Sequence, residues 1–89
     1  MSGPPAVIFG RVLDSGGKPL ANARVYFTQG PVPLPEIATL TDDSGAFSLT
    51  APAPGKYVLE GAADGYANSS ATVNIAKGHE AHVDIKLKG

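Results

Sequence analysis

Two segments of the chain, residues 45–49 and 55–59, each place a glycine ahead of apolar residues that lie two positions apart. A third glycine stands directly before an aromatic residue in the Gly65-Tyr66 pair. A period of two is that of a β-strand with one buried face, whereas an amphipathic helix repeats every 3.6 residues. Because glycine adopts the backbone angles of tight turns, the pattern predicts short antiparallel strands joined by turns. We therefore expect an all-β chain folded as a small sandwich.

Composition agrees with one globular domain spanning residues 1–89. A chain of this length removes roughly two-thirds of its unfolded surface from water. The absence of cysteine excludes a disulfide framework and a thiolate metal site. Hydrophobic residues make up 43% and charged residues 17%, and the formal net charge is −1. This charge gives no electrostatic reason to expect nucleic acid or an anionic lipid surface as partner.

Localisation is left open by the sequence. Residues 1–5 carry no basic segment and no apolar run of the kind that begins a signal peptide. No stretch approaches the roughly 20 apolar residues of a membrane span. We expect no membrane insertion, and a soluble chain that is cytoplasmic as given or exported as part of a larger assembly. The oligomeric state, the organism and the question of a complete or excised chain stay open.

Turn residues divide the chain into seven predicted strands. Glycine and proline together occupy a fifth of all positions and mark many short turns. The predicted strands cover residues 6–13, 24–28, 37–41, 46–50, 56–62, 71–76 and 81–88. The proline-rich segment 30–35 is expected to be an extended connector, since proline cannot donate to a strand ladder.

The last predicted strand shows the alternation of faces most clearly. Its apolar side chains are Val83, Ile85 and Leu87, and its polar side chains are His82, Asp84, Lys86 and Lys88. Phe47, Tyr57 and Leu59 are predicted to lie in the same core. In the first strand the inward positions are Ile8, Gly10 and Val12. The small residue Gly10 indicates a point where the opposite sheet, or a bulky ring, comes close.

These motifs, in this order, resemble the carboxypeptidase regulatory-like domains over residues 8–87. The matching residues are Ile8-x-Gly10-x-Val12-x-Asp14-x-x-Gly17-x-Pro19-Leu20-x-x-Ala23-x-Val25, then Thr41-Asp42-x-x-Gly45-x-Phe47-x-Leu49, Gly55-x-Tyr57-x-Leu59 and Gly65-Tyr66. The resemblance implies a seven-stranded antiparallel Greek-key sandwich of the prealbumin (transthyretin) type. It also implies that the first strand lies beside the fourth and sixth strands, and the second beside the third and fifth.

The resemblance implies an appendage with no shared catalytic activity. Such domains accompany peptidases, outer-membrane transporters, surface adhesins and secretion-machine spikes, so the fold does not settle the function. The more distantly similar collagen-adhesin B-type domains cross-link a first-strand lysine with the help of a buried glutamate. Here Ile8, Gly10 and Val12 leave no lysine in place. Glu60 resembles the assisting acid but alternates outward, and we expect it to be solvated.

No constellation of residues points to an enzyme or a metal site. His79 and His82 straddle a turn and a strand start, and no third ligand is evident where zinc takes three or four. The chain ends in Ile85-Lys86-Leu87-Lys88-Gly89 and so lacks the Tyr-Arg-Gly-Ser ending of the hydroxyisourate hydrolases. An intradiol dioxygenase needs two Tyr and two His at its iron centre, whereas the three tyrosines here occupy fold positions or a strand exterior. We therefore assign no catalytic residue, no cofactor and no metal.

The interpretation that we favour is a non-catalytic structural or protein-interaction module. Its setting is expected to be a bacterial cell surface or a secretion or phage-like spike, with a protein partner or a parent polypeptide. The outward positions Val7, Phe9 and Leu13 form a candidate contact surface. The alternative is that the stem of Arg11 and residues 1–5 cover them.

A second hypothesis is a small-ligand or peptide-binding sandwich that uses the loops at one end. These loops are residues 30–35, 52–55 and 64–70, and their candidate binding residues are Val32, Leu34 and Tyr66. Tyr66 is expected to plug one end of the sandwich with its ring, because a buried tyrosine combines an apolar ring with a satisfied polar tip. The third and weakest hypothesis, a metal protein or hydrolytic enzyme, depends on His79 and His82.

Overall fold

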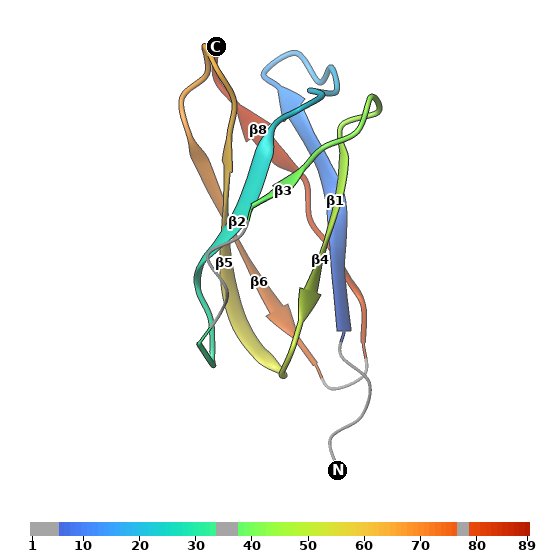
Figure 1. Cartoon of the computed structure of the whole chain (residues 1–89), viewed down its shortest axis with the longest axis vertical. Coiled ribbons are helices and arrows are strands. Elements are labelled where there is room, and N and C mark those ends of the chain that lie inside the picture. Colours follow the sequence, from blue (N-terminus) through green and yellow to red (C-terminus); the bar gives the residue numbers. More distant parts are fainter. Residues whose placement is uncertain (1–5, 34–37, 77–78) are drawn as a thin grey trace.

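The chain forms two four-stranded sheets that pack face to face (Figure 1). The structure, a computed structural model, describes residues 6–33, 38–76 and 79–89. The first sheet contains β4 (Ala46–Ala51), β1 (Ala6–Asp14), β7 (Ala81–His82) and β8 (Ile85–Leu87). The second contains β3 (Thr39–Leu40), β2 (Arg24–Gln29), β5 (Gly55–Ala62) and β6 (Ser69–Ile75). No helix in the described ranges could cross a membrane.

The predicted all-β sandwich is confirmed, with one change in its last strand. Residues 81–88 form the two short strands β7 and β8 in place of one continuous strand. Both run parallel to β1, whereas every other pair of strands is antiparallel. The described residues therefore form eight strands, and the first sheet is mixed. Predicted residue Ile37 of the third strand lies outside the described ranges, and β3 is only two residues long.

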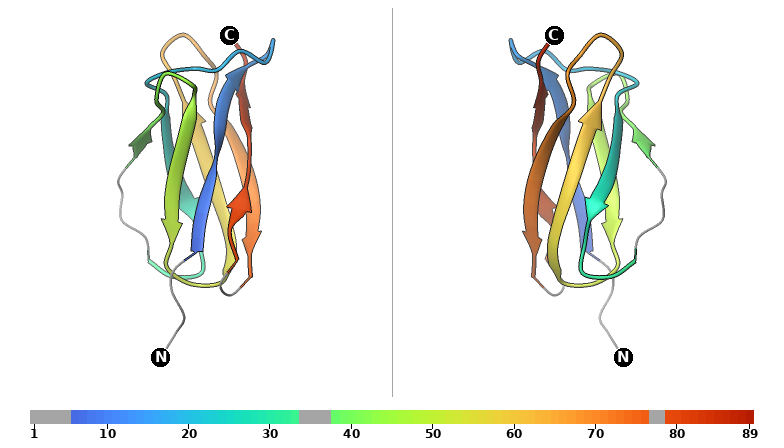
Figure 2. Two further views of the ribbon diagram at one scale, coloured as in Figure 1. Left: turned by 90° about the vertical axis from the view of Figure 1, so that its right-hand side faces the viewer. Right: turned by 90° about the vertical axis from the view of Figure 1, so that its left-hand side faces the viewer.

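The predicted neighbours of the first strand are half right. β1 does lie beside β4, but its other neighbours are β7 and β8, and β6 belongs to the second sheet (Figure 2). The physical reason is the short connection over residues 63–68. It joins β5 and β6 as an antiparallel hairpin, with Gly61 opposite Ser69 and Gly55 opposite Ile75. A strand bound in that hairpin is not available to the other sheet.

The core lies between the two sheets and contains most of the residues that the alternation predicted, whereas Val83 is only half-buried against it. Tyr57, Leu59 and Phe47 are buried, and the last strand contributes Ile85 and Leu87 to the same cluster. β1 contributes Ile8 and Val12, β2 contributes Val25, and Ala23 just before β2 is also buried. This closely packed interior fixes which side of β1 faces solvent, and so positions the surface described next.

Candidate functional site

A shallow hollow of about 430 Å³ lies on the outer face of the first sheet. It spans three neighbouring strands. Its lining residues are Phe9, Gly10, Arg11, Ala46, Phe47, His82 and Asp84. The hollow is thus centred on β1 and includes one member of the contact surface predicted from the sequence.

The last strand presses closely against β1 at Gly10. An added Cβ at Gly10 would lie 1.6 Å from the carbonyl oxygen of Val83, far inside any allowed contact. The Val83 amide donates to the Phe9 carbonyl at 2.9 Å. The backbone does come close at Gly10, as predicted, but the neighbour is Val83, in the segment between β7 and β8, and not the opposite sheet or a ring. Only glycine permits this approach.

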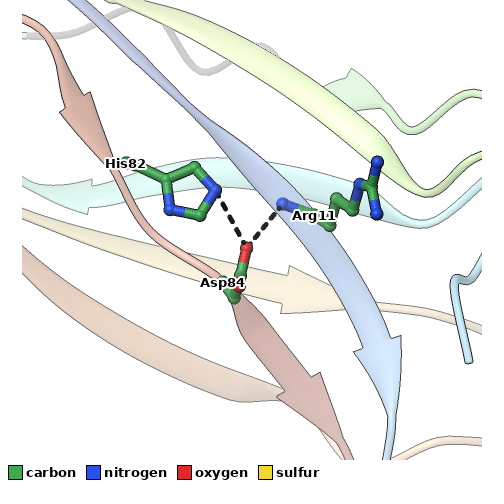
Figure 3. Close-up of polar contacts among 3 residues, drawn as sticks. All are labelled: Arg11, His82 and Asp84. Atoms are coloured by element: carbon green, nitrogen blue, oxygen red, sulfur yellow. Dashed lines mark hydrogen bonds and ion pairs between the residues drawn. The ribbon is translucent and has the colours of Figure 1, made fainter. Parts of the chain in front are cut away.

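Next to Val83, the side chain of Asp84 takes the place of a backbone carbonyl as a hydrogen-bond acceptor for β1. Its Oδ1 accepts a hydrogen bond from the Arg11 amide at 3.2 Å and lies 3.3 Å from Nε2 of His82 (Figure 3). The register of β1 against β7 continues unchanged into β8. The gap between β7 and β8 is therefore not a change of register. It is the point where the Asp84 carboxylate, in place of a backbone carbonyl, accepts the hydrogen bond of the Arg11 amide. Both His82 and Asp84 are exposed, so their contact adds at most about 1 kcal/mol to stability.

Phe9 is the apolar element of the hollow. Its side chain stays 38% exposed, and its ring meets that of His82 edge-on, with centroids 5.3 Å apart and planes at 61°. Val7 and Leu13 are only half-buried on the same face of β1. Leu13 lies four residues beyond Phe9, about 13 Å along a strand. Val7 and Phe9 therefore form a compact pair, and Leu13 stands apart. The alternative cover, residues 1–5, lies outside the described ranges.

The predicted loop site is wrong as a single site, because its loops lie at opposite ends of the sandwich. Residues 30–33 meet residues 52–55, since an added Cβ at Gly55 would lie 2.8 Å from Pro31. Residues 63–68 follow the other end of β5, about 23 Å away for an eight-residue strand (Figure 1). Val32 is exposed at the first end, and Leu34 lies outside the described residues. Tyr66 is half-buried at the second end, packed against the core.

The histidine pair does not assemble a metal site within the described part of the chain. His79 is exposed and its amide donates to the carbonyl of Ala76 at 3.1 Å. His82 turns to Phe9 and Asp84 instead. No group of three potential metal ligands occurs among the described residues.

A second polar cluster lies on the outer face of the other sheet, and sequence reasoning missed it. The Tyr26 hydroxyl donates to Oε2 of Glu60, which also accepts from Nδ2 of Asn68 at 3.4 Å. The hydrogen bond to Glu60 raises the pKa of Tyr26 above its ordinary value, and partial burial of the hydroxyl adds to the rise. Glu60 is half-buried and paired, so the expectation of a solvated residue is wrong. The alternation of side chains predicts that Tyr26 and Glu60 both point outward. It does not predict that they lie directly opposite each other on β2 and β5.

The fold and this surface define a small β-sandwich module of the prealbumin type. The chain matches the carboxypeptidase regulatory-like domain over residues 7–88 and belongs to that family, which is a non-catalytic sandwich module. No curated protein matches the chain.

Several solved structures share the fold at low sequence identity. The TIE protein of Bacillus anthracis superposes with a TM-score of 0.73 at 17% identity, covering 96% of this chain and 16% of its own. Hydroxyquinol 1,2-dioxygenase from Pseudomonas putida gives 0.73 at 13%, covering 100% and 58%. A DUF3823 family protein from Parabacteroides merdae gives 0.66 at 23%, covering 97% and 47%. The chain thus spans about half or less of the length of most of these proteins, and the likeness concerns the fold alone.

Proposed function

We propose that the chain is a non-catalytic interaction module that contacts a protein partner, or the body of a larger polypeptide, through the outer face of its first sheet. The observation that carries this proposal is the hollow around Phe9. It offers an exposed aromatic ring beside charged and polar groups. We propose no catalytic, metal or cofactor role.

The composition of the hollow is that of a protein contact. Interfaces are enriched in aromatic and arginine side chains, with an apolar centre and a polar rim. Phe9 supplies the apolar centre, and Arg11, His82 and Asp84 supply the rim. A partner that inserts an apolar side chain beside Phe9 would remove its exposed ring from water, which is worth more than any one of the exposed polar contacts.

The setting that we propose is a bacterial appendage, on the cell surface or in a secretion or phage-like spike. The family resemblance supports it. The small share of the Bacillus anthracis chain that this fold covers also agrees with a module carried within longer proteins. The residues of the hollow fit each of these settings equally, so identification of the partner would distinguish between them.

The test is capture of the partner by matched variants of the domain. A photoreactive residue placed at Val7, next to the hollow, should give a cross-linked partner from cells of the source organism. Phe9→Glu should abolish that product and leave the thermal midpoint nearly unchanged, because Phe9 is already partly in water. Thr72→Glu, an exposed change on β6 of the other sheet, is the control and should leave capture intact. Capture that survives Phe9→Glu would contradict the proposal.

A further inference from the structure

Along one side of the sandwich, the described residues provide no strand that is hydrogen-bonded to the outer edge of β4. On the opposite side, β8 lies beside β6, and the Ala67 amide donates to the Lys88 carbonyl at 2.7 Å. On the β4 side, the strand of the second sheet that comes near is β3, which is two residues long and is hydrogen-bonded to β2 (Figure 2). Within the described residues, β4 is therefore an edge strand with one unpaired side.

The backbone groups on that side can be identified from the register of β4 with β1. The Val12 amide donates to the Gly45 carbonyl, so residues at odd positions of β4 face β1. Ala46, Ser48 and Thr50 then direct both their amide and their carbonyl groups toward the free edge. An edge of this kind is a template for another strand.

Both ends of the unpaired segment are closed. At its start, the Ala46 amide donates to the Asp42 carboxylate at 3.0 Å, and the Ala46 carbonyl accepts from the Asp42 amide at 3.1 Å. At its other end stands Pro52, which has no amide hydrogen to donate. The groups left for pairing are those of Ser48 and Thr50.

We propose that a second copy of this chain pairs its own β4 with this edge, antiparallel, to form a symmetric dimer with a continuous sheet across the two molecules. Ser48 of each copy lies opposite Thr50 of the other, and each pair exchanges both of its backbone hydrogen bonds. Leu49 meets its own counterpart on the two-fold axis. A two-fold contact of this kind uses the same patch on both molecules and closes on itself.

The register is determined by the closed ends. A shift that places Ser48 opposite itself would set Ala46 against Thr50 and break the bonds of Asp42 in both copies. The opposite shift would set Ser48 against Pro52 and lose a donor. Pairing Ser48 with Thr50 is the arrangement that satisfies every free edge group of both residues.

The side chains along this edge favour a second copy as the occupant. Residues 46–51 carry no charge and no proline, so two identical edges meet without like-charge repulsion. β8, on the opposite side of the same sheet, carries Lys86 and is followed by Lys88. Two leucines flank the open side of β4. Leu40 is 62% exposed beside a hollow of about 340 Å³, and Leu49 is only half-buried. A partner strand would cover both.

The test is self-association of the purified chain, measured by sedimentation over a wide concentration series. Ser48→Pro removes one edge donor from each copy and leaves pairing with β1 intact, because the Ser48 amide faces away from β1. It should weaken the dimer about tenfold or more. Thr72→Lys, on the exposed face of the other sheet, is the matched control and should not change the association.

A charge exchange tests the register independently of the proline variant. Chains with Ser48→Lys and chains with Thr50→Glu should form a mixed dimer more readily than either forms with itself, since the introduced lysine and glutamate stand opposite each other. That preference would support the proposed pairing. A chain that stays monomeric at every concentration would overturn it. So would a dimer that Ser48→Pro leaves unchanged and Phe9→Glu abolishes, which would place the contact on the face of β1.

Discussion

Replacing Gly10 by alanine is the most direct test of how the last strand is held against β1. An added Cβ would lie 1.6 Å from the Val83 carbonyl oxygen and 2.6 Å from its carbonyl carbon. The obstacle is backbone, so no change of a side-chain rotamer can relieve it. Either β1 or the segment between β7 and β8 has to move.

The expected loss follows from that displacement. Overpacking of a closely packed position costs about 1–3 kcal/mol. Moving Val83 away also weakens the bond from its amide to the Phe9 carbonyl and the bond from the Arg11 amide to Asp84, each worth about 0.5–1.5 kcal/mol. We therefore expect Gly10→Ala to lower the free energy of unfolding by about 2–6 kcal/mol, a large part of the 5–15 kcal/mol typical of a domain.

Urea denaturation with an unchanged slope measures this loss, and amide hydrogen exchange locates it. Protection should fall first at the amides of Val83 and Arg11. Gly16→Ala is the control, because its added Cβ would meet only the Asp14 carboxylate, at an ordinary 3.4 Å. That variant should be neutral or slightly stabilising. A Gly10→Ala protein with the midpoint of the wild type would show that the last strand does not press on β1 at this point.

Three further substitutions test the core and the turn before β4. Phe47→Ala deletes a buried ring and should lower the unfolding free energy by about 3–5 kcal/mol; an unmoved urea midpoint would place the wrong face inside. Tyr57→Phe removes a hydroxyl that donates to the Ala53 carbonyl at 2.6 Å and should cost about 1–3 kcal/mol by the same assay, whereas a neutral effect would argue against this bond. The pKa of Asp42 is lowered, first by the hydrogen bond from the Ser44 hydroxyl and then by those from backbone amides. The ionised carboxylate therefore stabilises the fold at any pH above the pKa of Asp42 in the unfolded chain. This contribution is lost as the pH falls through the lower pKa of the folded protein. The melting temperature of Asp42→Asn should therefore lie below that of the wild type at neutral pH and approach it below about pH 4; a constant difference would refute this.

The alternation of side chains was sufficient to predict which residues fill the core. It placed Phe47, Tyr57 and Leu59 inside and turned His82 and Asp84 outward, as found. Alternation depends only on local geometry, because a strand exposes its faces with a period of two wherever it pairs. The same pattern cannot say which strands are neighbours. The expectation of β6 beside the first strand rested on the family resemblance, and the pairing of β6 with β5 overturns it.

The contacts of the candidate site depend on register, which the sequence does not state. Phe9 meets His82 only because the parallel register of β1 and β7 sets them side by side. Tyr26 and Glu60 meet through the register of β2 with β5, which is shifted by an irregularity between Phe27 and Gln29. A shift of one residue would have turned each of these side chains to the other face.

The parallel pairing of the first and last strands has a mechanical consequence. β1 starts near the end of the sandwich marked N and β8 finishes near the end marked C (Figure 1). A longer polypeptide under tension, pulling before Ala6 and after Leu87, would drag the two strands past each other along their common axis. In that shear geometry the ladder bonds bear the load together, whereas an unzipping geometry breaks them one at a time. Since the ladder is interrupted between His82 and Ile85, where the Asp84 carboxylate accepts from the Arg11 amide, resistance to extension would come from two short patches of ladder that are loaded together.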